Sequence, residues 1–159
     1  MNNSQFDIFT RYVFILNSSK YTIEAGDISM QDRRDMMEKR IMVVDDDPDI
    51  LITIRKIFER EGYEVFTVDR GVDCIKELER GFEGIILMDI MMPFMDGWDT
   101  IEEITKRGLA KNVVISILTA KGNPDRNKIR GLESYIYDYI TKPFDVKKLV
   151  SNIRQMVAK

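Results

Sequence analysis

The chain has 159 residues, of which 44% are hydrophobic and 32% charged, so it is long enough for one domain with a full core plus an appendage. The formal net charge of -3 gives no broad basic field, and we expect neither nucleic-acid binding nor membrane insertion. One cysteine and no histidine exclude disulfide frameworks, Ser-His-Asp triads and nearly all zinc sites. Because no apolar run spans a bilayer and no secretory signal is present, we expect a cytoplasmic protein.

Residues 1–39 differ from the rest of the chain, because a short apolar stretch, Tyr12 to Leu16, is followed by a polar and irregular run. We predict that this segment is an N-terminal extension and that the main domain covers residues 40–159. The extension is too short for a winged-helix or three-helix DNA-binding domain. It could bind a partner, dock as a helix, or be translated from an early start codon, and the sequence leaves these alternatives open.

From residue 40 onward, short β-branched runs alternate with longer stretches of helical period, which is typical of a parallel α/β sheet. Asp47 can cap the first helix, with Pro48 in its first turn. The predicted strands are 41–44, 63–68, 84–88, 113–118 and 136–141. The predicted helices are 48–61, 71–80, 98–107, 125–134 and 146–157. Five strands alternating with five helices imply an open parallel sheet between two helix layers.

Polar residues stand at the ends of the predicted strands, and in a doubly wound sheet the carboxyl ends of the strands form the ligand site. Asp45 and Asp46 follow the first strand, and Asp89 follows the third. Thr119 and Lys142 follow the fourth and the fifth. Two carboxylates about 4 Å apart repel each other by about 4 kcal/mol at an effective dielectric near 20, so we expect a cation among the three. Oxygen ligands without histidine or cysteine favour Mg2+.

A carboxylate beside Mg2+, a lysine and a hydroxyl is equipped to attack phosphorus, because the cations neutralise charge on the transferring phosphoryl group. The product would be an aspartyl phosphate. Asp45 and Asp46 are adjacent and should point to opposite sides of the strand end, so one would bind the metal directly and the other through water. Asp89, on the neighbouring strand, is then left as the nucleophile.

Four segments of the chain resemble the motifs of one known family. They are VVDDDPDI (43–50), MDIMMPFMDGW (88–98), ILTAK (117–121) and DYITKPF (138–144). In order and approximate spacing they resemble the receiver domain of two-component response regulators, of the stand-alone chemotaxis-regulator-like type. The resemblance covers about residues 40–159. It implies a flavodoxin-like, doubly wound five-stranded parallel sheet with strand order 2-1-3-4-5.

The function that the resemblance implies is a phosphorylation-dependent signalling switch. Asp89 would accept a phosphoryl group from a histidine kinase or phosphotransfer protein, and the domain would then alter its binding to a downstream protein target. Asp45, Asp46, Asp89 and the backbone carbonyl of Met91 would hold Mg2+. Such a domain is a phosphoacceptor protein that assists its own phosphotransfer and autodephosphorylation, and is not an enzyme in the usual sense.

The resemblance also implies roles around the phosphate. Thr119 and Lys142 would contact it, and Tyr139 would turn inward when Thr119 moves toward it. The bond between Lys142 and Pro143 would be cis. We expect partner surfaces around Ile129, Tyr139 and the last helix. We also expect the lifetime of the aspartyl phosphate to depend on Met91 and Lys121, which should flank the path of the attacking water.

The sequence departs from the family pattern before the fifth strand, where Tyr135 and Ile136 replace a common Gly-Ala pair. We also expect no output domain, since the last helix closes the sequence. Two alternatives remain open. A haloacid-dehalogenase-like phosphatase uses similar residues, but its nucleophile lies on the first strand in a DxD pattern. The second alternative is a scaffold protein that keeps the receiver fold but is not phosphorylated.

Overall fold

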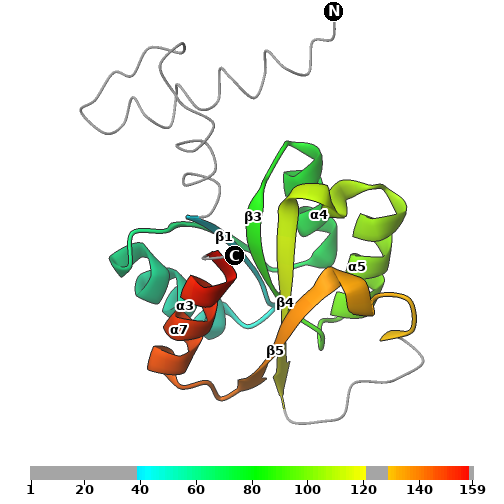
Figure 1. Ribbon diagram of the computed structural model, residues 1–159. Coiled ribbons are helices and arrows are strands. Elements are labelled where there is room, and N and C mark those ends of the chain that lie inside the picture. Colours follow the sequence, from blue (N-terminus) through cyan, green and yellow to red (C-terminus); the bar gives the residue numbers. More distant parts are fainter. Residues whose placement is uncertain (1–38, 121–128, 158–159) are drawn as a thin grey trace, which may run out of the picture. The chain divides into compact units, whose positions relative to one another are not determined.

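A computed structural model describes residues 39–120 and 129–157, which contain a five-stranded parallel sheet with helices on both faces (Figure 1). The strands are β1 (Arg40–Val44), β2 (Glu64–Val68), β3 (Gly84–Asp89), β4 (Val113–Ala120) and β5 (Ile136–Lys142). The α-helices with described bounds are α3 (Pro48–Arg60), α4 (Gly71–Glu79), α5 (Gly97–Lys106) and α7 (Val146–Val157). The strand order is β2-β1-β3-β4-β5, which confirms the doubly wound, flavodoxin-like sheet.

The strands continue further toward the site than the sequence predicted. Asp89 is the last residue of β3, and Thr119 and Lys142 lie within the ladder between β4 and β5. A short 3-10 helical turn precedes each of the last two strands: η1 (Leu109–Asn112) precedes β4, and η2 (Glu133–Tyr135) precedes β5. Residues 125–128 of the predicted helix at 125–134 lie outside the described residues. Of the rest, Ile129 is helical, residues 130–132 form a turn, and the predicted end is the η2 turn instead of a continued α-helix.

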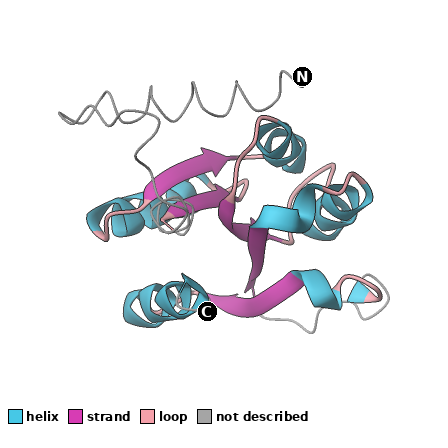
Figure 2. Ribbon diagram, turned by 45° about the horizontal axis from the view of Figure 1, so that its top comes forward, coloured by secondary structure: helices cyan, strands magenta, loops and turns pink. Residues whose placement is uncertain are grey.

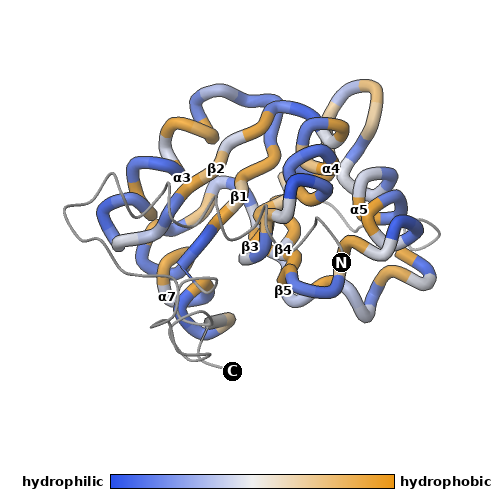
Figure 3. Tube along the Cα trace, turned by 90° about the horizontal axis from the view of Figure 1, so that it is seen from above, coloured by the Kyte–Doolittle hydropathy of each residue, from blue (hydrophilic) through white to orange (hydrophobic). Residues whose placement is uncertain are grey.

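Side chains of β1 alternate between the two faces of the sheet, as the pleat of a strand requires. Ile41 and Val43 pack on one face with residues of α3 and α7, whereas Met42 and Val44 pack on the other with residues of α4 and α5. Figure 2 shows the helices on either side of the magenta strands. In Figure 3 the central strands are largely orange, because a parallel strand covered on both faces is apolar throughout.

The first helix begins as the sequence predicts. The Asp47 carboxylate accepts a hydrogen bond from the backbone N–H of Asp49 at 2.9 Å, and Pro48 occupies the first turn. The carboxylate of Asp45 in turn accepts the backbone N–H of Asp47 at 3.0 Å. The helix start therefore holds the Asp45 side chain at the end of β1, where it is fully buried.

No left-handed turn precedes β5 at the Tyr135–Ile136 step. Ile136 has an extended backbone, with φ of -103°. Among the described residues other than glycine, a positive φ occurs at Phe94. The departure of Tyr135 and Ile136 from the family pattern is thus accommodated by ordinary backbone conformations. Within the part of the chain that is described, no helix combines the length and the apolar character needed to cross a membrane.

Candidate functional site

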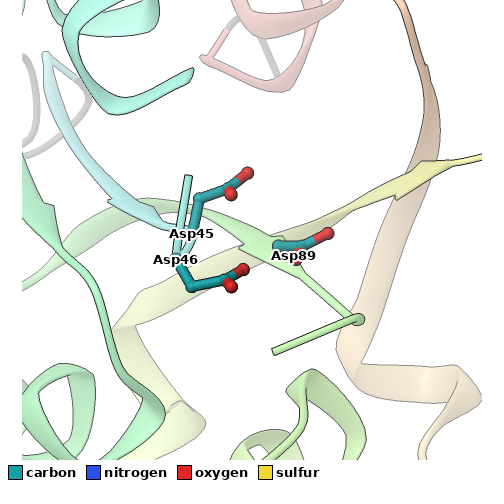
Figure 4. A group of neighbouring side chains, drawn as sticks. All are labelled: Asp45, Asp46 and Asp89. Carbon is teal, nitrogen blue, oxygen red and sulfur yellow. The ribbon is translucent and has the colours of Figure 1, made fainter. Parts of the chain in front are cut away.

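Three carboxylates converge where β1 and β3 end, and we call Asp45, Asp46 and Asp89 the acidic cluster (Figure 4). One carboxylate oxygen from each lies within 4.8 Å of the others. Asp45 and Asp89 are buried and Asp46 is exposed, so the cluster opens to solvent on the Asp46 side. We expected Asp45 and Asp46 to point to opposite sides of the strand end. Both extend toward Asp89 instead, because they follow the strand and no longer obey its alternation.

Lys142 brings a positive charge into contact with the acidic cluster. Its Nζ donates to Asp45 Oδ2 at 2.5 Å and to Asp89 Oδ1 at 3.1 Å. The side chain of Lys142 is itself largely buried, and its peptide bond to Pro143 is cis, as the resemblance implies. The sequence predicted that these residues share one crevice. The direct ion pair between Asp45 and Lys142, 97 residues apart, was not predicted.

Burial and charge act in opposite directions on these groups. Burial raises the pKa of Asp89, and the nearby Lys142 ammonium only partly reverses this, while the Asp45 charge adds to it. For Lys142, burial alone would lower the pKa, but its hydrogen bond to Asp45 and the charges of Asp89 and Asp45 raise it above the usual value. Lys142 is therefore firmly protonated. The ionised form of Asp89 is less favourable in the protein than it would be in water. A bound cation would stabilise this ionised form.

The backbone beside Asp89 is packed tightly against the start of α5. A Cβ atom on Gly97 would lie 2.3 Å from the backbone oxygen of Asp89, so only glycine fits there. The N–H of Gly97 also donates to the carbonyl of Ile90 at 3.3 Å. Asp96 and Asp99 form a capping box that starts the helix at this point. Gly97 is thus a positioning residue for Asp89. The predicted helix began at residue 98, so the sequence-based prediction gave Gly97 no role. The Asp-Gly step before a helical run was the available signal.

The loop between Asp89 and Gly97 exposes two large apolar side chains. Met91 is 72% exposed, and its backbone acts to lower the pKa of the Asp89 carboxyl. Phe94 is fully exposed and has a φ of 66°, a left-handed conformation that is unusual for an aromatic residue. Sequence reasoning did not single out Phe94. No sequence signal marks it, because glycine and asparagine are the residues that normally indicate such a turn.

Thr119 and Tyr139 do not adopt the arrangement that the resemblance implies for a phosphorylated site, with Thr119 moved toward the phosphate and Tyr139 turned inward. The hydroxyl of Thr119 is buried and donates to the backbone carbonyl of Ala120 at 3.0 Å. Tyr139 is 41% exposed, and partial burial raises the pKa of its hydroxyl. The described arrangement is thus one in which the Tyr139 ring is turned outward. Lys121, expected to flank the path of water, lies outside the described residues.

The donor chemistry of the acidic cluster fits a hard divalent cation. All three ligand groups are carboxylates, and no thiol lies among them. Mg2+ prefers oxygen ligands and commonly binds through one or two carboxylates while keeping several waters. The exposed side of the cluster at Asp46 leaves room for such waters. The residues therefore fit the predicted metal.

Comparison with known proteins identifies the family. The model of the response regulator receiver domain matches residues 41–154, which is most of the chain and contains the acidic cluster and Lys142. The chain belongs to the response regulator receiver domain family. In this family, which serves two-component systems, the domain is a phosphoacceptor signalling domain and not a classical enzyme.

Solved receiver domains have the same fold as this one. A receiver domain protein described as CheY-like, from Methanospirillum hungatei JF-1, is 42% identical, with a TM-score of 0.72 over 76% of this chain and 95% of that chain. The N-terminal domain of a response regulator receiver protein from Methanoculleus marisnigri JR1 is 35% identical, with a TM-score of 0.59 over 76% of this chain and 97% of that chain. These matches confirm that the chain is similar to CheY-like receiver domains.

Curated relatives of the receiver domain are longer proteins. The transcriptional regulatory protein PcoR of Escherichia coli is 34% identical over 75% of this chain and 51% of its own length. The transcriptional regulatory protein ResD of Bacillus subtilis is 36% identical over 76% of this chain and 48% of its own length. This chain therefore spans about half the length of the curated relatives that it matches.

Proposed function

We propose that this receiver domain accepts a phosphoryl group on Asp89 and uses it to switch the binding of a partner. The donor would be a phosphohistidine on a histidine kinase or a phosphotransfer protein, because this chain has no histidine of its own. The observation that carries the proposal is the contact of one lysine, Lys142, with both Asp45 and Asp89 at the carboxyl edge of the sheet. Family membership supports the same role.

In the proposed transfer, an Asp89 carboxylate oxygen attacks phosphorus, the bond from phosphorus to the donor nitrogen breaks, and the imidazole leaves. Lys142 is 3.1 Å from Asp89 Oδ1 and would compensate charge on the arriving phosphoryl oxygens. Gly97 holds the backbone of Asp89 in place. Because Asp89 is only 3% exposed, the site also limits access of water to the product.

Asp45, Asp46, Asp89 and the backbone carbonyl of Met91 would hold Mg2+ in this proposal. When bound, the ion supplies positive charge that makes the approach of a phosphoryl group to a carboxylate favourable. Asp45 is oriented for this role by its hydrogen bond from the N–H of Asp47. Lys142 would then be free to shift its contacts from Asp45 toward the phosphoryl group.

The switch would depend on Thr119 and Tyr139. Thr119 at the end of β4 would exchange its hydrogen bond to the Ala120 carbonyl for one to the phosphoryl group. That movement opens space into which the exposed Tyr139 ring can turn, and the surface around Ile129, Tyr139 and α7 changes for a partner. A bias of a few kcal/mol on the two arrangements is enough for such a switch.

The domain boundary and the setting belong to the same proposal. We propose that the receiver domain covers residues 40–159, that residues 1–39 are an extension of it, and that the protein acts in the cytoplasm. The downstream target would be a protein. The near-neutral charge of -3 supports a protein partner more than nucleic acid.

Labelling by a small phosphodonor tests the proposal. Purified parent protein, Asp89→Asn and Asp69→Asn are incubated with radiolabelled acetyl phosphate, with Mg2+ or with EDTA. Asp69 follows β2 at the same edge of the sheet but is not in the acidic cluster, so it is a matched control. We expect Mg2+-dependent labelling of the parent and of Asp69→Asn, and none of Asp89→Asn. Equal labelling of Asp89→Asn and the parent would refute the proposal.

The two alternative functions are less well supported. A haloacid-dehalogenase-like phosphatase would place its nucleophile at the end of β1, whereas the family match identifies a receiver domain. Repeated turnover of a phosphate ester would restore that alternative. A receiver-fold scaffold would not need the buried contact of Lys142 with Asp89, and its partner binding would be insensitive to Asp89→Ala.

A further inference from the structure

Met91 is distinguished from the other described methionines by its exposure. It is 72% exposed, whereas most of the others are buried in the core. The buried or partly buried methionines of the described ranges are Met42, Met88, Met92, Met95 and Met156. An exposed thioether meets dissolved oxidants directly, and a buried one does so only when the fold opens. Within the described ranges, Met91 is therefore the methionine most open to oxidation.

The position of Met91 is fixed beside the phosphoacceptor. It lies two residues after Asp89 in the chain, and the Met91 backbone acts to lower the pKa of the Asp89 carboxyl. The loop on its other side is closed by hydrogen bonds from Gly97 to Ile90 and from Met95 to Pro93, at 3.3 and 2.8 Å. Met91 is thus a solvent-exposed residue two positions along the chain from a carboxylate that is itself buried.

We propose that Met91 is an oxidation site for hydrogen peroxide and that its oxidation shortens the lifetime of the aspartyl phosphate. The inference rests on the proposed function of Asp89. In the oxidation, the sulfur lone pair attacks one peroxide oxygen, the O–O bond breaks, and an S=O bond forms. The sulfur is oxidised by two electrons, and the peroxide is reduced to water.

The chemical change at Met91 alters how water is held near Asp89. A thioether sulfur is a weak hydrogen-bond acceptor, whereas a sulfoxide is polar. Hydrolysis of the aspartyl phosphate requires a water oxygen to attack phosphorus; the bond to Asp89 breaks, inorganic phosphate leaves, and a water proton passes to solvent. A sulfoxide oxygen that accepts a hydrogen bond from this water would orient it. We expect about tenfold faster hydrolysis, below the roughly 10²–10⁴-fold of a positioned base, because a sulfoxide takes up no proton.

The single cysteine does not offer an alternative target of comparable reactivity. Cys74 lies on α4 and is buried in the core cluster that also contains residues of α5, and burial raises the pKa of its thiol to about 12. The thiolate is the reactive form, so Cys74 reacts slowly with peroxide in the folded protein.

The experiment compares four proteins: the parent, Met91→Leu, Met91→Gln and Met95→Leu. Each is phosphorylated with acetyl phosphate and Mg2+, freed of excess donor, and followed for loss of phosphate, with and without prior treatment with dilute hydrogen peroxide. Peptide mapping locates every sulfoxide. Met91→Leu retains all other methionines and Cys74, so it controls for oxidation elsewhere in the chain. Met91→Gln presents a polar acceptor without any oxidant.

The expected result has three parts. Met91 becomes a sulfoxide before the buried methionines, and peroxide accelerates decay about tenfold in the parent and in Met95→Leu but not in Met91→Leu. Untreated Met91→Gln decays faster than the untreated parent. Unchanged decay with Met91 fully oxidised, or acceleration that persists in Met91→Leu, would overturn the inference while leaving the proposed function intact. If untreated parent takes up no phosphate on Asp89, the proposed function fails, and the inference fails with it.

Discussion

Removal of the Lys142 charge should destabilise the fold far more than removal of a surface lysine. In Lys142→Met, two buried carboxylates lose their shared ammonium while the apolar stem is retained. At 2.5 and 3.1 Å, each contact is worth roughly 5–7 kcal/mol of gross Coulomb attraction at an effective dielectric near 20. Desolvation offsets much of this, and deletion of one partner of a buried pair costs about 3–5 kcal/mol. We expect a loss of that size in the free energy of unfolding.

Urea unfolding at neutral pH measures this loss, and Lys76→Met is the matched control. Lys76 Nζ lies 2.9 Å from Asp73 Oδ1 on the surface of α4, where Asp73 also has Arg70 as a partner. Exposed pairs of this kind contribute about 0–1 kcal/mol. The two substitutions remove the same group at similar distances, so the difference between them reports burial and the two-carboxylate environment.

Mg2+ supplies a second readout for the same substitution. A divalent ion in the acidic cluster replaces part of the charge that Lys142→Met removes, so the stability gap between this variant and the parent should narrow as Mg2+ is added. The gap for Lys76→Met should not change. A loss for Lys142→Met no larger than that of the control, or a gap that Mg2+ does not narrow, would refute the account of the site. Should the variant fold only with Mg2+, the prediction is met in its strongest form.

Three other variants test neighbouring features. Because burial raises the pKa of Asp89 in the folded state above 3.8, its ionised form costs stability once the pH exceeds that value. Without Mg2+, the parent should therefore be less stable than Asp89→Asn at pH 7, with a smaller gap at pH 4; a gap independent of pH in urea titrations would contradict this. Gly97→Ala should lose about 1–3 kcal/mol and label more slowly with acetyl phosphate, since its Cβ would lie 2.3 Å from the Asp89 carbonyl. Unaltered labelling would show that Gly97 does not position Asp89. Phe94→Asn should gain about 0.5–1 kcal/mol in thermal or urea unfolding, because asparagine tolerates a φ of 66° and no packing is lost; a destabilised variant would mean that the ring has contacts.

Much of the site could be predicted because parallel strands carry their polar residues to one edge. The apolar runs that end at Asp45 and Asp89 identify β1 and β3, and the parallel arrangement then brings their ends together. The ends of β4 and β5 were harder to place. Thr119 and Lys142 are polar and interrupt the apolar run, yet the backbone ladder continues through them, pairing Thr119 with Thr141 and Ala120 with Lys142. Hydropathy reports side chains, whereas a strand is defined by its backbone.

Other features depended on geometry that no local pattern carries. The ion pair of Lys142 with Asp45 joins residues 97 positions apart in the sequence. The distance between the two charged groups depends on the positions of β1 and β5 in the sheet, where β3 and β4 separate them. The close approach of Gly97 to Asp89 depends on how α5 enters the sheet. We propose two positions for the Tyr139 side chain, and the structure has the outward one. The sequence identifies the residue but does not determine its side-chain rotamer.

Location of the phosphoryl group by peptide mapping tests the central claim most directly. The parent is incubated with acetyl phosphate and Mg2+, digested under conditions that preserve acyl phosphates, and analysed by mass spectrometry. The account predicts one phosphoryl group per chain, on the peptide that contains Asp89 and at that residue. A phosphoryl group on Asp45, Asp46 or a hydroxyl side chain, with Asp89 unmodified, would contradict it.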